Sequence, residues 1–269
     1  MSGSVGLVIP AYRPDTERLV EYVFALEETL APEEIRIELD APETKLLDRL
    51  RSTPATVSTV PYRRGKGAAI TAGFETLDTD VFAFADADGS TPPEELQRII
   101  DPVTHRQTDL SVGSRRHPDA TVTSHQTAGR RYLGDAFAWL ARRLLDIKLY
   151  DYQCGGKAIT SEGWEAVRQH LYAPGFAWDI ELVAVADALE LTVLETPIQW
   201  HDRPGSTVSP VRTTLSLARA LLVVRHRASR LRNSKMNTAI ADHHGQSQAL
   251  IDRKRDASGR RETRRDTGK

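Results

Sequence analysis

Two aspartates one residue apart are the clearest chemical feature of the sequence. Asp86 and Asp88 directly follow the apolar run Val81–Ala85 and precede a glycine and two prolines. Side chains at i and i+2 of a strand point to the same side, so an extended backbone would present both carboxylates together. Adjacent carboxylates repel unless a cation lies between them, and Mg²⁺ or Mn²⁺ prefers such oxygen ligands. The pattern predicts a metal site, although a simple turn at Asp88 would give the same residues.

A basic, glycine-containing segment precedes this strand. Arg63-Arg64-Gly65-Lys66-Gly67 lies where a predicted strand gives way to a predicted helix. The two glycines would let the backbone approach a ligand closely, although their spacing is not that of a P-loop. Taken with the carboxylate pair on the next strand, the segment predicts a diphosphate held between a metal and several cations.

The elements that must position these groups alternate between strands and helices in the first half of the chain. The predicted strands are Val5–Ile9, Ile35–Leu39, Thr56–Val60, Val81–Ala85 and Asp109–Gly113. The predicted helices are Leu19–Leu30, Gly67–Leu77 and one that opens at Pro92. This alternation predicts an α/β fold with a mainly parallel sheet that helices cover on both faces. Ligands of such sheets bind at the carboxyl ends of the strands, where the two aspartates lie.

The second half of the chain is less regular. Helices are predicted over Gly134–Leu145, after Ser161, over Asp179–Leu189 and over Val211–Leu231, with an edge strand at Thr192–Pro197. We expect residues 1–210 to form one catalytic domain. Residues 211–232 are expected to form a basic amphipathic helix, and residues 233–269 a disordered, charged tail whose composition cannot build a core.

The predicted last helix carries one apolar stripe. Its residues recur three or four positions apart, and they are Leu217, Leu221, Val224, Ala228 and Leu231. Arginines fall away from the stripe, at positions 212, 219, 227 and 230. Such a helix can lie on an anionic membrane surface with its apolar side in the headgroup boundary. The alternative is a terminal helix whose stripe packs on the domain, and both hold if only the Arg225–Arg232 end reaches lipid.

Composition restricts the classes of function. The chain has 269 residues, 40% of them hydrophobic and 27% charged, and its net charge of −1 argues against nucleic-acid binding. Cys154 is the single cysteine, so no internal disulfide is possible. The first residues show no basic and apolar leader, and no window approaches the length of a membrane span. We therefore expect a cytoplasmic protein, associated peripherally with the cytoplasmic face of a membrane.

The order of the motifs resembles glycosyltransferase family 2, whose members have the GT-A fold. The motifs are VIPAY, a strand ending at Asp40, RRGKGAAITAGFE, ADADGSTPPEEL and VGSRR. In the second half, DYQCGGKAI, FAWDIELVAVA and TPIQWHDRPGSTVSP are similar to dolichyl-phosphate β-glucosyltransferases and, more loosely, to dolichol-phosphate mannose synthases. The resemblance implies that Asp86 and Asp88 bind Mg²⁺ or Mn²⁺, which holds the diphosphate of a nucleotide sugar.

The resemblance also implies roles for individual residues. The implied donor-binding residues are Pro10, Ala11, Tyr12, Asp40, Lys66, Asp86 and Ala87, and Asp40 would accept a hydrogen bond from the nucleotide base. The implied acceptor-phosphate residues are Arg115, Arg130, Arg131, Arg203 and Ser206, because arginine forks suit phosphate oxygens. The implied catalytic residues are Asp88, Asp179 and Arg203.

The implied reaction is the inverting transfer of a hexose to dolichyl or another polyprenyl phosphate. UDP-glucose is the favoured donor, and GDP-mannose, which would make the chain a mannose synthase, is the alternative. The sequence departs from the family at Asp40-Ala41-Pro42-Glu43, where Asp-Asp-Gly-Ser is usual, and at Arg63, where asparagine is common. Other hypotheses are transfer to another glycan or lipid, a non-catalytic module that binds nucleotide sugars, and a nucleotidyltransferase.

Overall fold

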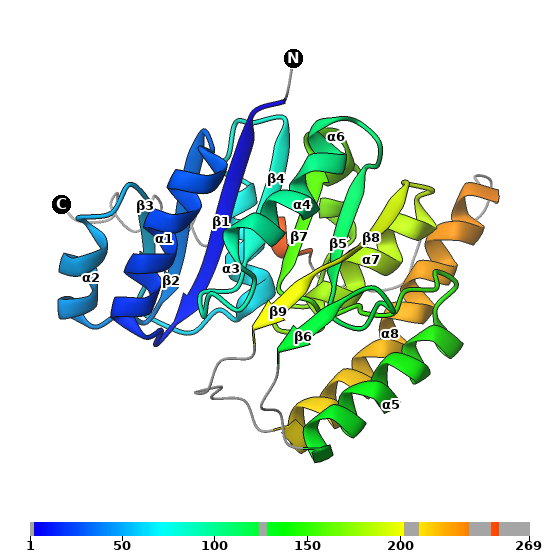
Figure 1. Cartoon of the computed structure of the whole chain (residues 1–269). Coiled ribbons are helices and arrows are strands. Elements are labelled where there is room, and N and C mark those ends of the chain that lie inside the picture. The colour runs from blue at the N-terminus through cyan, green and yellow to red at the C-terminus, as the bar shows by residue number, and fades with distance from the viewer. Residues whose placement is uncertain (1–2, 124–127, 202–209, 237–248, 253–269) are drawn as a thin grey trace, which may run out of the picture.

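The computed structural model describes residues 3–123, 128–201, 210–236 and 249–252. Its centre is a seven-stranded sheet with the order β3-β2-β1-β4-β7-β5-β8 (Figure 1). The strands are β1 (Val5–Tyr12), β2 (Glu34–Asp40), β3 (Thr56–Val60), β4 (Val81–Ala85), β5 (Leu110–Ser114), β7 (Gly156–Thr160) and β8 (Val193–Pro197). A second, two-stranded sheet pairs β6 (Thr121–Thr123) with β9 (Gln199–His201).

Eight α-helices are present in the described ranges. They are α1 (Thr16–Leu30), α2 (Thr44–Leu50), α3 (Lys66–Phe74), α4 (Pro93–Thr104), α5 (Ala128–Leu144), α6 (Ser161–Val167), α7 (Trp178–Ala188) and α8 (Pro210–Met236). A short 3₁₀-helix, η1 (Arg168–His170), follows α6. The α/β class predicted from the alternating pattern is therefore confirmed.

The sheet is mainly parallel, as predicted, with one exception at its centre. Strand β7 runs antiparallel to both of its neighbours, β4 and β5. No strand was predicted there, because Gly156 and Lys157 interrupt the apolar run that marks a buried strand. The consequence matters for the site, since β7 carries Lys157 into the interior beside the end of β4.

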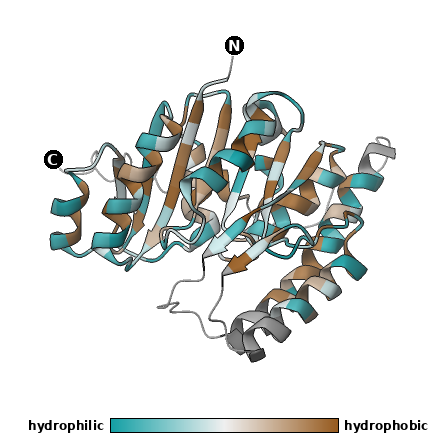
Figure 2. Ribbon diagram, viewed as in Figure 1, coloured by the Kyte–Doolittle hydropathy of each residue, from teal (hydrophilic) through white to brown (hydrophobic). Residues whose placement is uncertain are grey.

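Both faces of the sheet are buried, which explains the continuous apolar runs of its strands. Phe82 and Phe84 of β4 pack in one core together with side chains of α3, α6, α7 and α8. Val81 and Ala83, which alternate with them, pack in a second core with α1 and α4. In Figure 2 the strands are coloured mainly as hydrophobic, and the hydrophilic residues lie on the outer helices.

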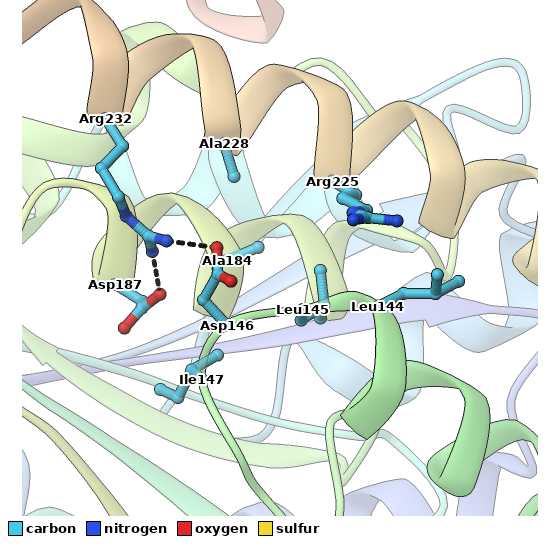
Figure 3. Close-up of a pocket in the computed structure, with 9 residues that line it drawn as sticks. All are labelled: Leu144, Leu145, Asp146, Ile147, Ala184, Asp187, Arg225, Ala228 and Arg232. Atoms are coloured by element: carbon cyan, nitrogen blue, oxygen red, sulfur yellow. Dashed lines mark hydrogen bonds and ion pairs between the residues drawn. The ribbon is translucent and has the colours of Figure 1, made fainter.

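The apolar stripe of α8 faces the protein. Leu221 and Val224 are at most 2% exposed and belong to the same core as α7, while α8 also lies against α5. Arg232, near the C-terminal end of α8, forms ion pairs with Asp187 of α7 and with Asp146, which follows α5 (Figure 3). These ion pairs hold that end of α8 against the domain. The structure therefore supports packing of the stripe on the domain, the alternative interpretation, and contact of α8 with a membrane stays a prediction.

The tail also differs from its prediction at two points. Helix α8 continues to Met236, beyond the predicted boundary at 233. Leu250, inside the predicted tail, is 6% exposed and donates its backbone N–H to the carbonyl of Leu171. This segment therefore contributes to the core, contrary to the expectation from composition. No helix in the described ranges has the length and hydrophobicity needed to cross a membrane.

Candidate active site

The predicted donor residues meet at the carboxyl edge of the sheet. Strands β1 and β2 are parallel, and Tyr12 at the end of β1 pairs in register with Asp40 at the end of β2. Strand β4 runs parallel to β1 and ends at Ala85, so Asp86 emerges at the same edge. The fold therefore brings together segments that are far apart in the sequence.

Asp86 and Asp88 lie in a turn rather than on the strand. The strand ends at Ala85, and the N–H of Gly89 donates to the carbonyl of Asp86 at 3.3 Å. The carboxylate of Asp88 accepts from the N–H of Ser90 at 2.9 Å, and its side chain is exposed. Because both residues follow the end of β4, the strand geometry from which their common side was predicted does not apply. The turn sets the positions of the two carboxylates instead.

Lys66 connects Asp86 to Asp179. Helix α3 begins at Lys66, and its ammonium lies 2.9 Å from Oδ1 of Asp86 and 3.0 Å from Oδ2 of Asp179. Lys157 from β7 donates to Oδ1 of Asp179 at 2.7 Å and to the carbonyl of Cys154 at 2.8 Å. Two lysines and two aspartates therefore form one continuous cluster of alternating charge.

The environment of this cluster perturbs its pKa values. Burial alone would lower the pKa of Lys66, but Asp179 and Asp86 together hold that pKa above its ordinary value. Burial would raise the pKa of Asp179, yet Lys157 and Lys66 hold it below its usual range. Burial raises the pKa of Asp86, and the nearby Asp88 carboxylate adds to this effect against the attraction of Lys66.

Two glycines allow the close packing around this cluster. A Cβ atom at Gly155 would overlap the carboxylate of Asp86, whose backbone N–H donates to the Gly155 carbonyl at 3.0 Å. A Cβ atom at Gly67 would overlap the side chain of Trp178 at the start of α7. Substitution at either position would push α3, α7 or the Asp86–Asp88 turn apart, so both glycines maintain the geometry of the site.

Asp40 is paired within the protein. Its carboxylate accepts from the N–H of Arg64 at 2.6 Å, from Nε of Arg64 at 2.7 Å and from the N–H of Gly65 at 3.1 Å. Arg64 also donates to Glu38, and Asp40 is 2% exposed. Its resemblance-based role was to accept a hydrogen bond from the nucleotide base, and in the structure the carboxylate instead orients the loop before α3.

The end of β1 presents an aromatic surface with cations on it. The guanidinium of Arg63 lies 4.4 Å from the centre of the Tyr12 ring, and that of Arg13 lies 5.4 Å from it. Of the other predicted donor residues, Ala11 is buried, whereas Pro10 and Ala87 are partly exposed. Arg63, the departure from the usual family residue, therefore lies directly on a predicted donor-binding side chain.

Arg115 is held rigidly beside the same edge. Its Nε and Nη2 donate to the two carboxylate oxygens of Asp151 at 2.6 and 3.0 Å, and its guanidinium lies 4.9 Å from the Trp200 ring centre. Burial alone would raise the pKa of Asp151, but Arg115 holds it well below its usual range. The carboxylate of Glu195 in turn accepts from the N–H groups of Tyr150 and Asp151. This chain of contacts fixes the guanidinium.

A comparison with known protein families identifies the chain. The sequence profile described as Glycosyl transferase family 2 matches residues 7–163, more than half of the chain. The match contains Asp40, Lys66, Asp86, Asp88 and Arg115. The chain belongs to glycosyltransferase family 2.

Curated proteins that resemble this family 2 chain act on sugars. The glycosyltransferase AglD of Haloferax volcanii is 30% identical over 163 residues, 60% of this chain and 25% of that protein. The dolichyl-phosphate beta-glucosyltransferase of Mus musculus is 27% identical over 188 residues, 68% of this chain and 58% of that protein. The chain therefore spans less than two thirds of the length of these relatives.

A solved structure confirms the fold of the family 2 chain. Glucosyl-3-phosphoglycerate synthase from Mycobacterium tuberculosis, in complex with Mn²⁺, UDP and glucosyl-3-phosphoglycerate, superposes with a TM-score of 0.61 at 18% identity. The match covers 84% of this chain and 80% of that one. At this identity the likeness establishes a shared architecture, the GT-A fold that the motif order predicted.

The aspartate pair of the family 2 chain fits a divalent metal. Asp88 is exposed and about a third of the Asp86 side chain is accessible, so both can reach a ligand. Mg²⁺ is commonly held by one or two carboxylates together with substrate phosphates and water, and this donor set matches that chemistry. In the described residues no three histidine, cysteine or carboxylate side chains gather into a complete protein cage.

Four predicted acceptor residues have no described side-chain position. Arg130 and Arg131 belong to α5, but their side chains are outside the described part of the structure, and Arg203 and Ser206 lie in the undescribed range 202–209. Their acceptor roles stay predictions. Of the five predicted acceptor residues, Arg115 alone has a side chain that the structure places.

The structure adds residues that sequence reasoning did not select. Lys157 fixes Asp179, and Glu195 fixes the loop that carries Asp151. The position of Lys157 inside the DYQCGGKAI motif was a sequence signal that could have indicated its role. Trp178 is fully buried and donates to Thr71 at 3.1 Å, which makes it a core residue.

Cys154 also has a packing role. It is fully buried, and burial raises the pKa of its thiol to about 11, so the nucleophilic thiolate does not form near neutral pH.

Proposed function

We propose that this chain is a metal-dependent, inverting glycosyltransferase that moves a hexose from a nucleotide sugar to a polyprenyl phosphate such as dolichyl phosphate. The observation that carries the proposal is the accessible Asp86–Asp88 pair beside Lys66 and the fixed guanidinium of Arg115. Family membership supports the class of reaction. The resemblance to the mouse protein, whose name specifies glucose and dolichyl phosphate, supports the substrates.

The donor would bind at the edge formed by β1, β2 and β4. Asp86 and Asp88 would hold Mg²⁺ or Mn²⁺, which neutralises charge on the departing nucleoside diphosphate as a Lewis acid. Pro10, Ala11 and Tyr12 would line the nucleotide pocket. UDP-glucose is the favoured nucleotide sugar, since the resemblance to glucosyltransferases is the stronger one, and GDP-mannose is the alternative.

The acceptor chemistry needs cations more than it needs a base. A phosphate oxygen of the lipid would form the new bond to the anomeric carbon as the bond from that carbon to the nucleoside diphosphate breaks. The phosphate is already anionic near neutral pH, so no proton has to be removed. Arg115 would position it from one side, with Arg203 as the predicted second cation. Asp179, buried between two lysines, is better placed to orient Lys66 than to accept a proton.

One observation favours a second candidate, a non-catalytic module that binds nucleotide sugars. Asp40, which the family resemblance assigns to the base, is already engaged by Arg64 and Gly65. In a chain that had lost donor recognition, we would expect the carboxylate of Asp40 to be engaged by protein groups in this way. The fixed guanidinium of Arg115 at the proposed acceptor side counts against this alternative, because a module that only binds nucleotide sugars would not need an acceptor cation.

A transfer assay separates these candidates. The protein would be incubated with Mn²⁺, polyprenyl phosphate and either radiolabelled UDP-glucose or radiolabelled GDP-mannose, and the organic phase would be counted. We expect label from UDP-glucose with the wild type and background counts with Asp88→Asn. Calorimetric binding of a nucleotide sugar without any organic-phase label would favour the non-catalytic module.

We also propose that the chain meets its lipid acceptor at a membrane's cytoplasmic surface through the outer side of α8. Leu222 and Val223 are 56% and 48% exposed, on the side opposite the buried stripe. Arg219 and Arg230 are exposed on the same helix, which contains no aspartate or glutamate between Pro210 and Met236. Exposed apolar side chains flanked by cations suit an anionic headgroup boundary.

Vesicle flotation tests this surface. Deletion of α8 would remove Leu221 and Val224 from the core and uncover α7, so point substitutions are the better probe. We expect the wild type to float with vesicles that contain phosphatidylserine, in a salt-sensitive way, and the double variant Leu222→Glu, Val223→Glu to remain at the bottom. Phe24→Glu, at a 49% exposed position on α1, is the matched control and should float. Equal flotation of the double variant and the control would refute this surface.

A further inference from the structure

The ammonium of Lys66 lies against Asp86, the residue proposed to bind the metal ion. Its ammonium lies 2.9 Å from Asp86 and 3.0 Å from Asp179, and 9% of its side chain is exposed. Asp179 has a second partner, since Lys157 lies 2.7 Å from its other oxygen. The charges of two lysines and two aspartates sum to zero, so Asp86 is neutralised before any metal arrives.

We infer that Lys66 is an internal counter-ion that Asp86 exchanges for a divalent metal only when a nucleoside diphosphate binds as well. A metal at Asp86 would face the ammonium at short range, and like charges repel. A diphosphate offers the ammonium a new anionic partner. Lysine suits this exchange because it carries a point charge on a flexible stem with four carbons.

The location of Lys66 supports the exchange. It is the first residue of α3, where the helix dipole favours a negative charge. Its ammonium lies 5.1 Å from the centre of the Phe84 ring and so borders the core on one side. A short movement toward the end of β4 would carry it from Asp86 to a diphosphate at the same sheet edge. Lys66 is therefore a positioning residue whose two states couple two ligands.

The consequence is cooperative binding of metal and nucleotide, which rests on the proposed donor site. Metal alone binds weakly because it competes with the ammonium for Asp86. Linkage requires that the nucleotide raise the metal affinity by the same factor as the metal raises the nucleotide affinity. Couplings of this kind are commonly about 5- to 150-fold. Direct contact between metal and phosphate also contributes, so the test must isolate the part due to Lys66.

Calorimetric titration of Lys66 variants isolates that part. Mn²⁺ would be titrated into the wild type, Lys66→Met and Lys66→Gln without nucleotide, and UDP would be titrated without metal. Both variants should bind Mn²⁺ alone about tenfold or more tightly than the wild type, and UDP alone more weakly. The coupling factor should shrink in both. Lys45→Met, at an exposed lysine of α2, is the matched control and should change none of these values.

The opposite signs of the two changes are the decisive result. A lysine that only bound phosphate would weaken UDP without strengthening Mn²⁺, and a lysine that only stabilised the fold would strengthen neither. Unchanged or weaker Mn²⁺ binding in folded Lys66→Met and Lys66→Gln would therefore overturn the inference. A second set of titrations with GDP identifies which nucleoside diphosphate shows the coupling.

A measurement on the wild type covers the case in which these variants do not fold. The NMR signal of the Lys66 side-chain ammonium, assigned with Lys66→Arg, should keep its position when Mg²⁺ alone is added and shift when Mg²⁺ and UDP are added together. A shift with Mg²⁺ alone would contradict the exchange. Coupling without any sugar transfer would leave this inference intact and refute the proposed reaction, whereas binding of neither UDP nor GDP would refute the donor site itself.

Discussion

Replacement of Asp151 by asparagine tests how Arg115, the proposed acceptor cation, is held. Asp151 is 2% exposed and accepts from Nε and Nη2 of Arg115 at 2.6 and 3.0 Å. It also accepts from the N–H of Gln153 at 3.0 Å. Asparagine keeps the shape but removes the charge and one acceptor oxygen, so the guanidinium would be left beside an amide that cannot neutralise it.

The structure suggests the size of the effect. Breaking a buried ion pair by removing one partner commonly costs about 3–5 kcal/mol. About a quarter of the Arg115 side chain is accessible, at 24%, so the lower end, about 3 kcal/mol, is expected. For a chain of this size each kcal/mol lowers the melting temperature by about 2–4 °C, which gives a decrease of about 6–12 °C. Transfer should show a raised KM for the lipid phosphate and an unchanged KM for the nucleotide sugar.

Thermal unfolding and steady-state kinetics measure the two effects. Asp48→Asn is the matched control, because its ion pair with Arg51 is 65% and 73% exposed and should contribute at most about 1 kcal/mol. A loss below about 1 kcal/mol in Asp151→Asn, similar to the control, would refute the argument that the pair is strong. Equal changes of both KM values would refute the role of Arg115 at the acceptor.

The Arg115–Asp151 ion pair also predicts how the stability of the protein depends on pH. The pKa of Asp151 is depressed in the folded protein, so its stabilising contribution is complete above the unfolded value of about 3.9. It is lost as pH falls through the lower folded value. Between pH 5 and pH 7 the difference in stability between the wild type and Asp151→Asn should therefore stay constant, and it should narrow only in strong acid. A difference that grew as pH fell would show that another group dominates.

Three further results are expected. Asp86→Asn or Asp88→Asn should abolish transfer while circular dichroism stays unchanged, and excess chelator should do the same to the wild type; full activity in any of these would exclude the metal role. Arg203→Ala should weaken use of the lipid phosphate far more than nucleotide-sugar binding, and equal losses, measured by kinetics and calorimetry, would contradict that assignment. Gly155→Ala should displace the Asp86 carboxylate, costing about 1–3 kcal/mol of stability together with Mn²⁺ affinity; calorimetry that found wild-type Mn²⁺ binding would show that the turn can adjust.

The elements with one clear apolar pattern could be predicted from the sequence. The runs at Val5–Ile9 and Val81–Ala85 are apolar without interruption because helices bury both faces of the sheet. Strand β7 lacks such a run. Its identity depends on pairing with β4 and β5, which are distant in the sequence, so no local pattern reveals it.

The stripe of α8 shows a different limit of sequence reasoning. The same spacing of leucine, valine and alanine serves a helix on a membrane and a helix on a core, because both need one apolar side. The two locations differ in whether another helix covers the apolar side, and here α7 covers the stripe. The outward residues Leu222 and Val223 interrupt the simple amphipathic pattern, and they are what remains available for a membrane.

The site was predictable in its residue types but not in its pairings. Lys66, Asp86 and Arg115, which the motifs indicated, lie at one edge of the sheet. Their partners are separated by long stretches of chain: Arg64 reaches Asp40 across 24 residues, and Lys157 reaches Asp179 across 22. Spacing along the sequence carries no information about such contacts, so the engaged state of Asp40 emerged only from the fold.

Identification of the lipid product tests the central claim most directly. The protein would be incubated with Mn²⁺, unlabelled UDP-glucose and a polyprenyl phosphate, and the extracted lipid would be analysed by mass spectrometry and by digestion with an α- or a β-glucosidase. We predict a polyprenyl phosphate heavier by one hexose residue, with the β linkage that inversion of UDP-glucose requires. Unmodified lipid in the presence of bound nucleotide sugar, or a hexose released only by the α-glucosidase, would contradict the account.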